Sequence, residues 1–256
     1  MFKILLIGDA CEDVYHYGHC ERLSPEAPVP ILKHNYTERR DGMCLNVSNN
    51  LKAFEISVKV LSNKRILKKQ RFVDLKTKQH LLRIDFGESV LLKPCTKEEL
   101  ERVEFDNLDA VIISDYNKGF ITAENTKIIL AKAREQNLIV FVDSKKEDLS
   151  CFENCIIKIN ETEFKKIKKL PIKYELITTL ASAGARWNEK VYPTEECEIF
   201  DVSGAGDTFL SALTFKYLET KSMEKAIKFA NRCARIIVQK FGTYALTKKD
   251  IDDIRI

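Results

Sequence analysis

Long hydrophobic runs are missing from this 256-residue sequence. Its longest apolar stretches, such as residues 4–7 and 110–113, are far shorter than the roughly 18 residues needed to cross a bilayer. The amino terminus passes from an apolar run straight into Gly8 and Asp9 without a cleavage site of small residues, which indicates a buried strand and not a secretion signal. We therefore expect a cytoplasmic protein with no membrane partner.

Cysteine pairs with metal-ligand spacing are also missing. The eight cysteines include no Cys-x-x-Cys pair, and the nearest neighbours, Cys151 and Cys155, have no similar second pair. This spacing argues against a zinc module or a disulfide framework, and we expect free, mostly buried thiols. Apolar residues make up 45% of the chain, which is enough for the core of one large domain without such cross-links.

A strong excess of either charge is lacking as well. Lysine and arginine number 42 against 38 aspartates and glutamates, a formal net charge of +4. Nucleic-acid binding needs a concentrated basic surface, which this small and dispersed excess does not supply. We therefore expect small-molecule ligands and no nucleic-acid partner.

The sequence does contain an alternation of short β-branched runs with helical patterns. Such alternation is typical of a largely parallel sheet covered by helices. The predicted strands are residues 3–7, 58–61, 110–114, 139–143, 156–160 and 176–179. The predicted helices are approximately residues 123–136, 207–219 and 223–241.

Two regions interrupt this alternation. Residues 29–36 and 71–86 have the pattern of extended, partly exposed strands, and the second contains polar turn residues at 76–78. They predict a small antiparallel flap beside the main sheet, over the edge where open α/β sheets bind ligands. No repeat, low-complexity tract or linker indicates a second independent domain.

Glycine is scarce, with nine residues in the chain, yet two lie in the string Asp-Val-Ser-Gly-Ala-Gly-Asp-Thr at 201–208. A strong helix pattern follows, and the first amides of a helix have no internal partner, so they can receive an anion. Asp207 could then accept a hydroxyl proton during phosphoryl transfer. The alternative is an ordinary glycine turn in which Asp207 only caps the helix.

The motif Asp-x-x-Gly-Ala-Gly-Asp resembles the signature of the ribokinase-like (PfkB) sugar kinases, which transfer the γ-phosphoryl group of ATP to a sugar hydroxyl. Residues 13–18 and the string Arg-Leu-Ser-Pro-Glu-Ala-Pro-Val-Pro at 22–30 resemble the opening of the D-glycero-β-D-manno-heptose 7-phosphate kinases, the kinase half of bifunctional ADP-heptose synthesis proteins. Further matching blocks follow in the same order at residues 69–71, 82–86, 114–119, 142–145, 160–164, 230–231 and 242–243.

The resemblance implies a ribokinase-like three-layer α/β sandwich with a mostly parallel central sheet and a small antiparallel β flap. It implies one kinase domain over residues 1–256, with lid strands in about residues 14–40 and 66–88. The implied reaction is ATP-dependent phosphorylation of the anomeric hydroxyl of a heptose 7-phosphate, with Mg²⁺. Homodimerisation through the flap is expected too, because exposed extended strands tend to find cover.

The resemblance also assigns roles to residues. Asp207 would be the base, and the amides of Gly204, Ala205 and Gly206 would hold the transferring phosphoryl group. Asn160 and Glu163 would organise Mg²⁺ and its waters. The other nucleotide-side positions are Gly184, Asn231 and Gly242, together with Gly204 and Gly206. The sugar-side positions are Asp9, Asp13, Gly42 and Asn46. The cations suited to the substrate phosphate are Arg71, Arg83 and Lys118.

Several of these residues have a purely structural alternative. Asp13 could cap a turn, Arg83 could form a surface pair with Asp85, and Lys118 could be a solvated loop residue. The chain also departs from the family pattern. Met43 stands where the family has a second glycine, the family's helix and strand before the returning flap strand are absent, and the segment after Phe164 is short.

These departures leave rival functions open. The first is a kinase for another sugar or sugar phosphate. The second is a catalytically silent protein that binds a sugar phosphate.

Overall fold

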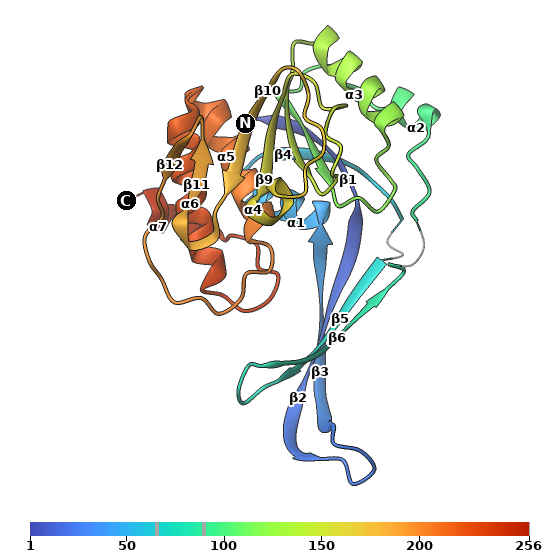
Figure 1. Ribbon diagram of the computed structural model, residues 1–256, viewed down its shortest axis with the longest axis vertical. Coiled ribbons are helices and arrows are strands. Elements are labelled where there is room, and N and C mark those ends of the chain that lie inside the picture. The colour runs from blue at the N-terminus through green and yellow to red at the C-terminus, as the bar shows by residue number, and fades with distance from the viewer. Residues whose placement is uncertain (65–66, 89–90, 256) are drawn as a thin grey trace.

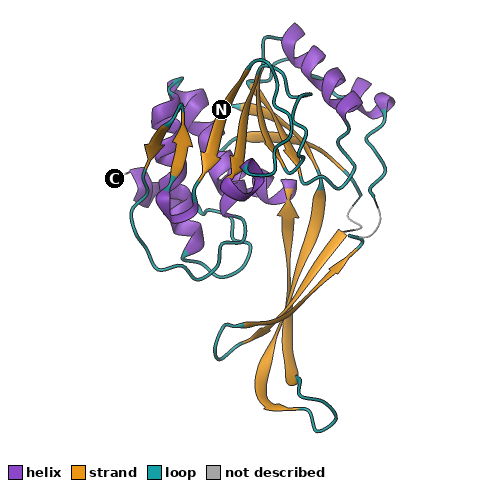
Figure 2. Cartoon of the chain, viewed as in Figure 1, coloured by secondary structure: helices purple, strands orange, loops and turns teal. Residues whose placement is uncertain are grey.

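The computed structural model describes residues 1–64, 67–88 and 91–255. A central sheet has the strand order β12-β11-β10-β9-β8-β7-β1-β4 (Figures 1 and 2). The pairs from β4 to β10 are parallel, and β11 and β12 continue the sheet in antiparallel fashion. The strands are β1 (Lys3–Gly8), β4 (Ser57–Ser62), β7 (Ala110–Asp115), β8 (Ile139–Ser144), β9 (Cys155–Asn160), β10 (Tyr174–Thr179), β11 (Ala185–Trp187) and β12 (Lys190–Tyr192). All six predicted strands are confirmed.

Helices cover both faces of this sheet and give the expected three layers. Alternate residues of a strand point to opposite faces, so Ile4 and Leu6 of β1 join one core cluster while Leu5 and Ile7 join the other. The first face carries α1 (Cys44–Ala53), α5 (Ala205–Thr220), α6 (Met223–Val238) and α7 (Lys248–Arg255). The second carries α2 (Lys97–Glu101) and α3 (Ala123–Glu135). The short α4 (Glu161–Phe164) and the 3₁₀ turn η1 (Ala181–Ala183) follow β9 and β10.

The predicted helix boundaries need two corrections. Helix α6 ends at Val238 and not near residue 241, because the Val238 carbonyl accepts hydrogen bonds from the amides of Phe200 and Asp201. Helix α5 begins at Ala205, two residues earlier than predicted, because Gly204 turns the chain into the helix.

The flap is a second, four-stranded sheet with the order β3-β2-β5-β6. Its strands are β2 (Ala10–Leu23), β3 (Pro30–Met43), β5 (Leu67–Asp74) and β6 (His80–Phe86). The β2–β3 and β5–β6 hairpins are antiparallel, as expected, and the β2–β5 pair that joins them is parallel. Residue 66, the predicted start of the second lid segment, lies outside the described residues. In Figure 1 the flap extends as a long stem away from the body.

The strand register gives the flap two different faces. The inner face, defined here as Asp13, Tyr15, Lys69, Arg71, Arg83 and Asp85, is polar and contacts the body. The outer face, defined as His16, Phe72, Leu82, Ile84 and Phe86, carries the apolar groups of the β5–β6 hairpin, with Glu12, Lys68 and Gln70 beside them on the same side. The difference follows from the two-residue period of a strand, which sends neighbouring side chains to opposite sides.

The turn after α6 connects the flap to the body. Arg40 Nη1 donates to the carbonyls of Phe241 and Thr243 at 3.1 Å, and the Thr243 amide donates to the Tyr15 hydroxyl at 2.7 Å. The His80 ring meets the Phe241 ring edge-on, with centroids 5.2 Å apart. Both flap hairpins therefore contact the same C-terminal turn.

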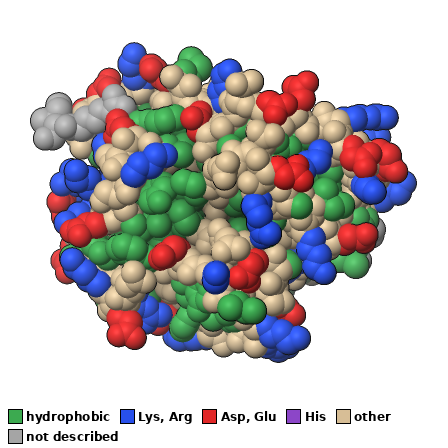
Figure 3. Space-filling model, turned by 90° about the horizontal axis from the view of Figure 1, so that it is seen from above, with side chains coloured by type: hydrophobic (Ala, Val, Ile, Leu, Met, Phe, Trp, Pro, Cys, Tyr) green, Lys and Arg blue, Asp and Glu red, His purple; other side chains and the backbone are tan. Residues whose placement is uncertain are grey.

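Other expectations concern the surface and the thiols. All eight cysteines are free, as expected. Among the described helices, none has the length and apolar character required to span a membrane. Figure 3 shows one face of the molecule from above, where cationic and anionic side chains are interspersed around exposed hydrophobic groups.

Candidate active site

Asp207 lies in the first turn of α5, with 4% of its surface exposed. Its Oδ1 atom accepts a hydrogen bond from the Tyr116 hydroxyl at 2.6 Å, and its Oδ2 atom accepts one from the Asn46 amide at 2.9 Å. Burial raises the pKa of Asp207 to about 6, although both hydrogen bonds oppose the rise. A well-held carboxylate with a pKa near neutrality is suited to accept a proton from an incoming hydroxyl.

Backbone amides at the start of α5 lie next to this carboxylate. Gly204 precedes the helix with φ 84°, in the left-handed region that favours glycine. A Cβ atom at Gly206 would lie 2.9 Å from Lys158 Nζ, so glycine lets the backbone pack against that ammonium. Helix-start amides beside a cation favour an anion such as a phosphoryl group.

Lys158 lies on β9, and its ammonium is 2.6 Å from Asp143 Oδ2 on β8. The side chains are only 4% and 10% exposed. Burial acts to lower the pKa of Lys158, but the charge and hydrogen bond of Asp143 outweigh it and raise the pKa above its ordinary value. The ammonium therefore stays charged at neutral pH.

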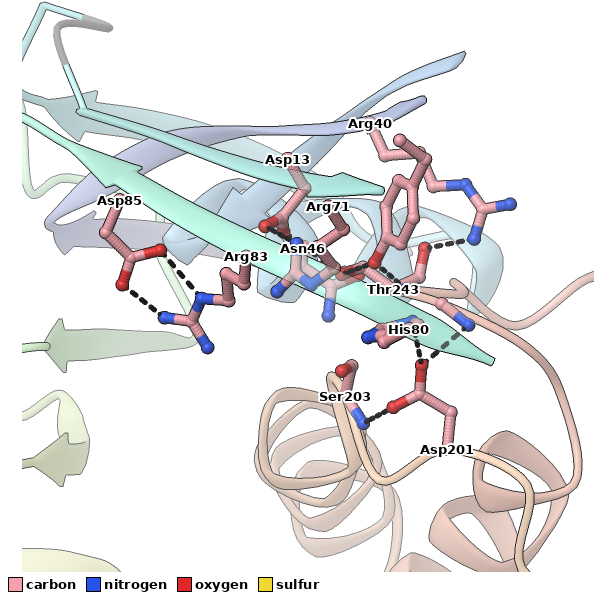
Figure 4. Close-up of polar contacts among 12 residues, drawn as sticks. Asp13, Arg40, Asn46, Arg71, His80, Arg83, Asp85, Asp201, Ser203 and Thr243 are labelled. Carbon is pink, nitrogen blue, oxygen red and sulfur yellow. Dashed lines mark hydrogen bonds and ion pairs between the residues drawn. The ribbon is translucent and has the colours of Figure 1, made fainter. Parts of the chain in front are cut away.

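A polar network lies on the inner face of the flap (Figure 4). Asp13 Oδ1 accepts from Arg71 Nη1 at 2.6 Å, and Asp13 Oδ2 accepts from the Thr243 hydroxyl at 3.0 Å. The Arg71 guanidinium also lies 5.0 Å from the centre of the Tyr15 ring, a cation–π distance. The contact of Asp13 with both arginine and threonine contradicts the alternative that Asp13 merely caps a turn.

Asp9 follows β1 and is fully buried. Its Oδ2 atom accepts from the Lys118 amide at 3.3 Å, whereas Oδ1 has no hydrogen-bond partner within the described part of the chain. Burial, together with the charge of Asp115, raises the pKa of Asp9 to about 6. The Lys118 ammonium forms an ion pair with Glu88, which lies just after the flap strand β6.

Asn46 and Gly42 lie where β3 enters α1. A Cβ atom at Gly42 would lie 2.5 Å from Asp13 Oδ2, so a larger residue would displace the Asp13 carboxylate. Met43 adopts φ 56° and ψ −131°, a conformation that glycine accepts far more readily than methionine. A cavity of about 510 Å³ opens beside these residues. It is lined by Glu12, Glu38, Arg39, Arg40, Asp41, Asn46, Asn49, Thr243, Tyr244 and Ala245.

Arg83 lies opposite Arg71 on the inner face of the flap. Its Nε and Nη2 atoms donate to the two carboxylate oxygens of Asp85, at 2.7 and 2.6 Å. The surface pair that the sequence left open as an alternative is therefore present, with Arg83 47% exposed. An exposed guanidinium of this kind can exchange its partner for a phosphate at small cost.

Asn160 and Glu163 form a capping box at the start of α4. Asn160 Oδ1 accepts from the Glu163 amide, and Glu163 Oε2 accepts from the Asn160 amide, both at 2.8 Å. Asn160 is exposed and Glu163 is half-buried. Each oxygen keeps a second lone pair, so an amide and one carboxylate fit Mg²⁺ that retains several waters. No cluster of three or more acidic, histidine or cysteine residues positioned for a metal occurs in the described ranges.

The three remaining nucleotide-side candidates lie in two different places. Asn231 Nδ2 donates to the Tyr192 carbonyl at 2.8 Å, and a Cβ atom at Gly184, where φ is 91°, would strike that carbonyl. Gly242 lies instead at the flap junction, where a Cβ atom would be 2.6 Å from Arg40 Nη1. Gly184 and Asn231 thus share surroundings that Gly242 does not.

Sequence reasoning missed two residues next to Asp207. Tyr116 belongs to a block that resembles the family, but the block gave no reason to connect its hydroxyl with Asp207. Lys158 was not considered, although a lysine in the apolar strand Cys-Ile-Ile-Lys-Ile-Asn was a signal. A charge buried among aliphatic residues needs a partner, and here the partner is Asp143.

Comparisons with known proteins identify relatives of this chain. Residues 155–250 match the family described as pfkB family carbohydrate kinase. The "Bifunctional protein HldE" of Helicobacter pylori strain J99 is 31% identical over an alignment of 306 residues that includes 98% of this chain. The chain spans 66% of the length of that relative.

Two solved structures share the fold. Phosphofructokinase-2 from Escherichia coli, in complex with substrates and products, matches with a TM-score of 0.74 at 15% identity and covers 99% of this chain and 98% of its own. Arabidopsis thaliana ribokinase, complexed with ribose and ATP, matches with a TM-score of 0.66 at 15% identity and covers 99% of each chain. The expected ribokinase-like fold is confirmed, and the chain belongs to the pfkB family of carbohydrate kinases.

Proposed function

We propose that this carbohydrate kinase uses ATP to phosphorylate the anomeric hydroxyl of D-glycero-D-manno-heptose 7-phosphate, giving the 1,7-bisphosphate. Residues 1–256 would act as one kinase domain in the cytoplasm. The observation that carries the proposal is the buried Asp207 carboxylate, which lies beside the first amides of α5 and accepts a hydrogen bond from the sugar-side residue Asn46. The similarity to HldE supports a heptose substrate.

The chain's own groups supply the chemistry of the transfer. Asp207 accepts the proton of the attacking hydroxyl, so that oxygen can bond to the γ-phosphorus as the bond to ADP breaks. The amides of Gly204, Ala205 and Gly206 and the ammonium of Lys158 stabilise charge on the transferring group. Asn160 and Glu163 would hold Mg²⁺, which neutralises phosphate charge when bound.

The sugar-side residues match a polyhydroxylated substrate. The Asp9 Oδ1 atom is a buried acceptor without a hydrogen-bond partner among the described residues, and a sugar hydroxyl would provide a donor. Asp13 and Asn46 present further polar groups, and the adjoining cavity of about 510 Å³ lies within the usual size range of small-ligand sites. These features favour a ligand with several hydroxyls.

The substrate's own phosphate is assigned to the inner face of the flap. Arg71 and Arg83 are cross-strand neighbours there, and Lys118 lies at the flap return. Two neighbouring guanidinium groups suit a phosphate, because each can donate two parallel hydrogen bonds. Arg83 is the more available of the two because its side chain is partly exposed.

A second copy of the chain is the proposed partner of the outer face. Leu82, Ile84 and Phe86 are 55%, 36% and 47% exposed, and the flap stands out from the body as an uncovered sheet. Contiguous apolar groups on a projecting sheet favour association. The outer face lies on the other side of the flap from the inner-face arginines, so a dimer would leave them accessible.

Heptose-dependent ADP release at millimolar Mg²⁺ tests the proposed function. We expect turnover with the wild-type protein and its loss in Asp207→Asn, by about 10²–10⁴-fold for removal of a general base. Asp250→Asn is the control, since Asp250 also accepts a tyrosine hydroxyl but lies on α7. No ADP release with an intact wild-type protein would contradict the proposal.

A panel of other sugars and thermal-shift measurements separate the rivals. Turnover only with a different sugar would identify a kinase of other specificity. A rise in melting temperature with heptose 7-phosphate but not with an ATP analogue would identify a silent binding protein, since a ligand that binds only the native state stabilises it.

A further inference from the structure

The Tyr116 side chain is the one phenol that contacts the Asp207 carboxylate within the described residues. Its hydroxyl lies 2.6 Å from Oδ1, a short distance typical of a hydrogen bond to an ionised acceptor. Asn46 holds the other oxygen at 2.9 Å. Each carboxylate oxygen has two acceptor positions, so the two donors leave room for a third donor.

The loop that carries Tyr116 is held firmly in place. Two lysine ammonium groups lie over the ring, with Lys145 Nζ 4.1 Å and Lys69 Nζ 5.6 Å from its centroid. The preceding residue, Asp115, accepts hydrogen bonds from Ser144 and Lys146, which ties the end of β7 to the end of β8. The phenol therefore has a fixed position before any ligand arrives.

We propose that Tyr116 is a positioning residue for phosphoryl transfer: its hydroxyl orients the Asp207 carboxylate toward the acceptor alcohol and sets the pH at which this carboxylate ionises. The inference rests on the proposed role of Asp207 as the base. A carboxylate held at both oxygens cannot rotate, so its remaining lone pairs have a fixed direction. Tyr116 itself exchanges no proton with the substrate.

The direction of the electrostatic effect follows from the geometry. A donor to the charged form favours that form, so the Tyr116 hydroxyl lowers the pKa of Asp207 below the value that burial alone would give. Removing the hydroxyl should therefore raise the pKa of Asp207 further above its ordinary value. The other titratable or charged groups around Asp207 are Asp143 on β8, Lys158 on β9, Cys11 on β2, Cys44 on α1 and Lys145 after β8.

The test compares Tyr116→Phe with Tyr244→Phe. Tyr244 also donates to a carboxylate, that of Asp250 at 2.9 Å, and makes no hydrogen bond to Asp207 among the described residues. The first readout is the ¹³C NMR titration of the Asp207 carboxyl in the full chain, assigned by its absence in Asp207→Asn. We expect the midpoint to rise by about one pH unit in Tyr116→Phe, in the range of a lost hydrogen bond, and to stay unchanged in Tyr244→Phe.

The second readout is kcat as a function of pH. Because the base must be ionised, the acid limb of the profile moves to higher pH in Tyr116→Phe, so the loss of kcat is larger at pH 6 than at pH 8.5. A merely structural role would lower kcat equally at every pH. An unshifted titration midpoint with an unshifted acid limb would overturn the proposal.

A graded variant covers the case in which Tyr116→Phe fails to fold. Difluorotyrosine at position 116 keeps the hydroxyl and makes it a stronger donor, so the midpoint of Asp207 should move downward; an upward or absent shift contradicts the inference. The NMR readout needs no substrate. Failure of the proposed function therefore appears as absent turnover in the wild type, whereas failure of this inference appears as an unmoved titration.

Discussion

The ammonium of Lys158 lies 2.6 Å from Asp143 Oδ2, and both side chains are buried beside the glycine-rich start of α5. The pair joins the carboxyl ends of β8 and β9 at the place where the chain turns into the helix that carries Asp207. Its positive member faces Gly206, so the site holds a fixed cation before any nucleotide binds. Removing either partner leaves an uncompensated charge in a dry environment.

The first prediction concerns this pair. Lys158→Met should lower the free energy of unfolding by about 3–5 kcal/mol, because it strands the Asp143 carboxylate. Lys158→Met combined with Asp143→Asn should recover most of this loss while turnover stays low. Urea denaturation of the wild type, both single variants and the double variant gives the coupling free energy. A double variant as unstable as the sum of its parts would show that the two groups do not interact.

The second prediction concerns pH and stability. Asp9 and Asp207 have pKa values raised to about 6, so the folded state binds their protons more tightly than the unfolded state. Their contribution to stability is fully present below about pH 4 and is lost as the pH rises through 6. The free energy of unfolding of Asp207→Asn, relative to that of the wild type, should therefore rise between pH 4 and 7 by an amount on the order of 3 kcal/mol.

Asp74→Asn serves as the contrast for this measurement. Hydrogen bonds from the Cys20 amide and from Thr77 lower the pKa of Asp74 to about 2, so its contribution is present above pH 4 and is lost as the pH falls toward 2. Denaturant midpoints should be measured across the pH range. The difference between variant and wild type should change with pH in opposite directions for the two variants. Parallel slopes would contradict the burial of Asp207 in its ionised form.

The third prediction separates the two inner-face arginines. The Arg71 and Asp13 side chains are 7% and 5% exposed, so Arg71→Met removes the partner of a buried carboxylate. This change should lower the free energy of unfolding by about 3–5 kcal/mol. Arg83→Met breaks an exposed pair with Asp85 and should cost less than about 1 kcal/mol. Arg83→Met should nevertheless raise the KM for the phosphorylated sugar, and Asp85→Asn should not. An unchanged KM would place the substrate phosphate away from Arg83.

The fourth prediction uses two matched capping boxes. Asn160→Ala and Thr96→Ala each remove the side-chain cap of a short helix, and each should cost about 1 kcal/mol. Only Asn160→Ala should also raise the Mg²⁺ concentration needed for half-maximal turnover. Asn160→Asp keeps the cap and an oxygen ligand, so it should retain both properties. Equal Mg²⁺ dependence in the two alanine variants would remove Asn160 from the metal site.

The fifth prediction concerns assembly. Ile84→Lys places a charge in the middle of the outer face of the flap and should convert a dimer into a monomer in sedimentation velocity at micromolar concentration. Ile172→Lys is the control, because Ile172 is 91% exposed on the body and lies outside the flap. A wild-type protein that sediments as a monomer would exclude the proposed second copy.

Six of the eight described strands of the central sheet could be predicted, because strands such as β1, β7, β8 and β9 are buried on both faces and have apolar runs. The strands β11 and β12 were not predicted, because three residues are too few to show such a run. Strand β2 lacks that signal: its inner-face residues serve the polar network, and its apolar side chains show no regular alternation. Helix α1 was missed for a related reason. It buries Asn46, Ser48 and Asn50, so its sequence does not show the apolar stripe expected of a packed helix.

Only part of the candidate site could be predicted from the sequence. The glycine-rich string and the family resemblance led to Asp207, Asn46, Asp13 and Arg71. In the structure Asp207 is hydrogen-bonded to Asn46, and Asp13 is hydrogen-bonded to Arg71 and Thr243. The sequence does not show which side chains from separate elements lie close together. The contact between Tyr116 and Asp207 spans 91 positions and depends on the order of β7 and α5 in space.

Met43 has a consequence for ligand recognition. Its positive φ costs about 1–3 kcal/mol, and such a backbone persists only where surrounding atoms enforce it. Since Gly42 precedes this residue and Asn46 follows it, relaxing the local tension would displace both. The wall of the cavity at Asn46 is therefore shaped during folding, and any ligand that enters must conform to a surface that has little freedom to adapt.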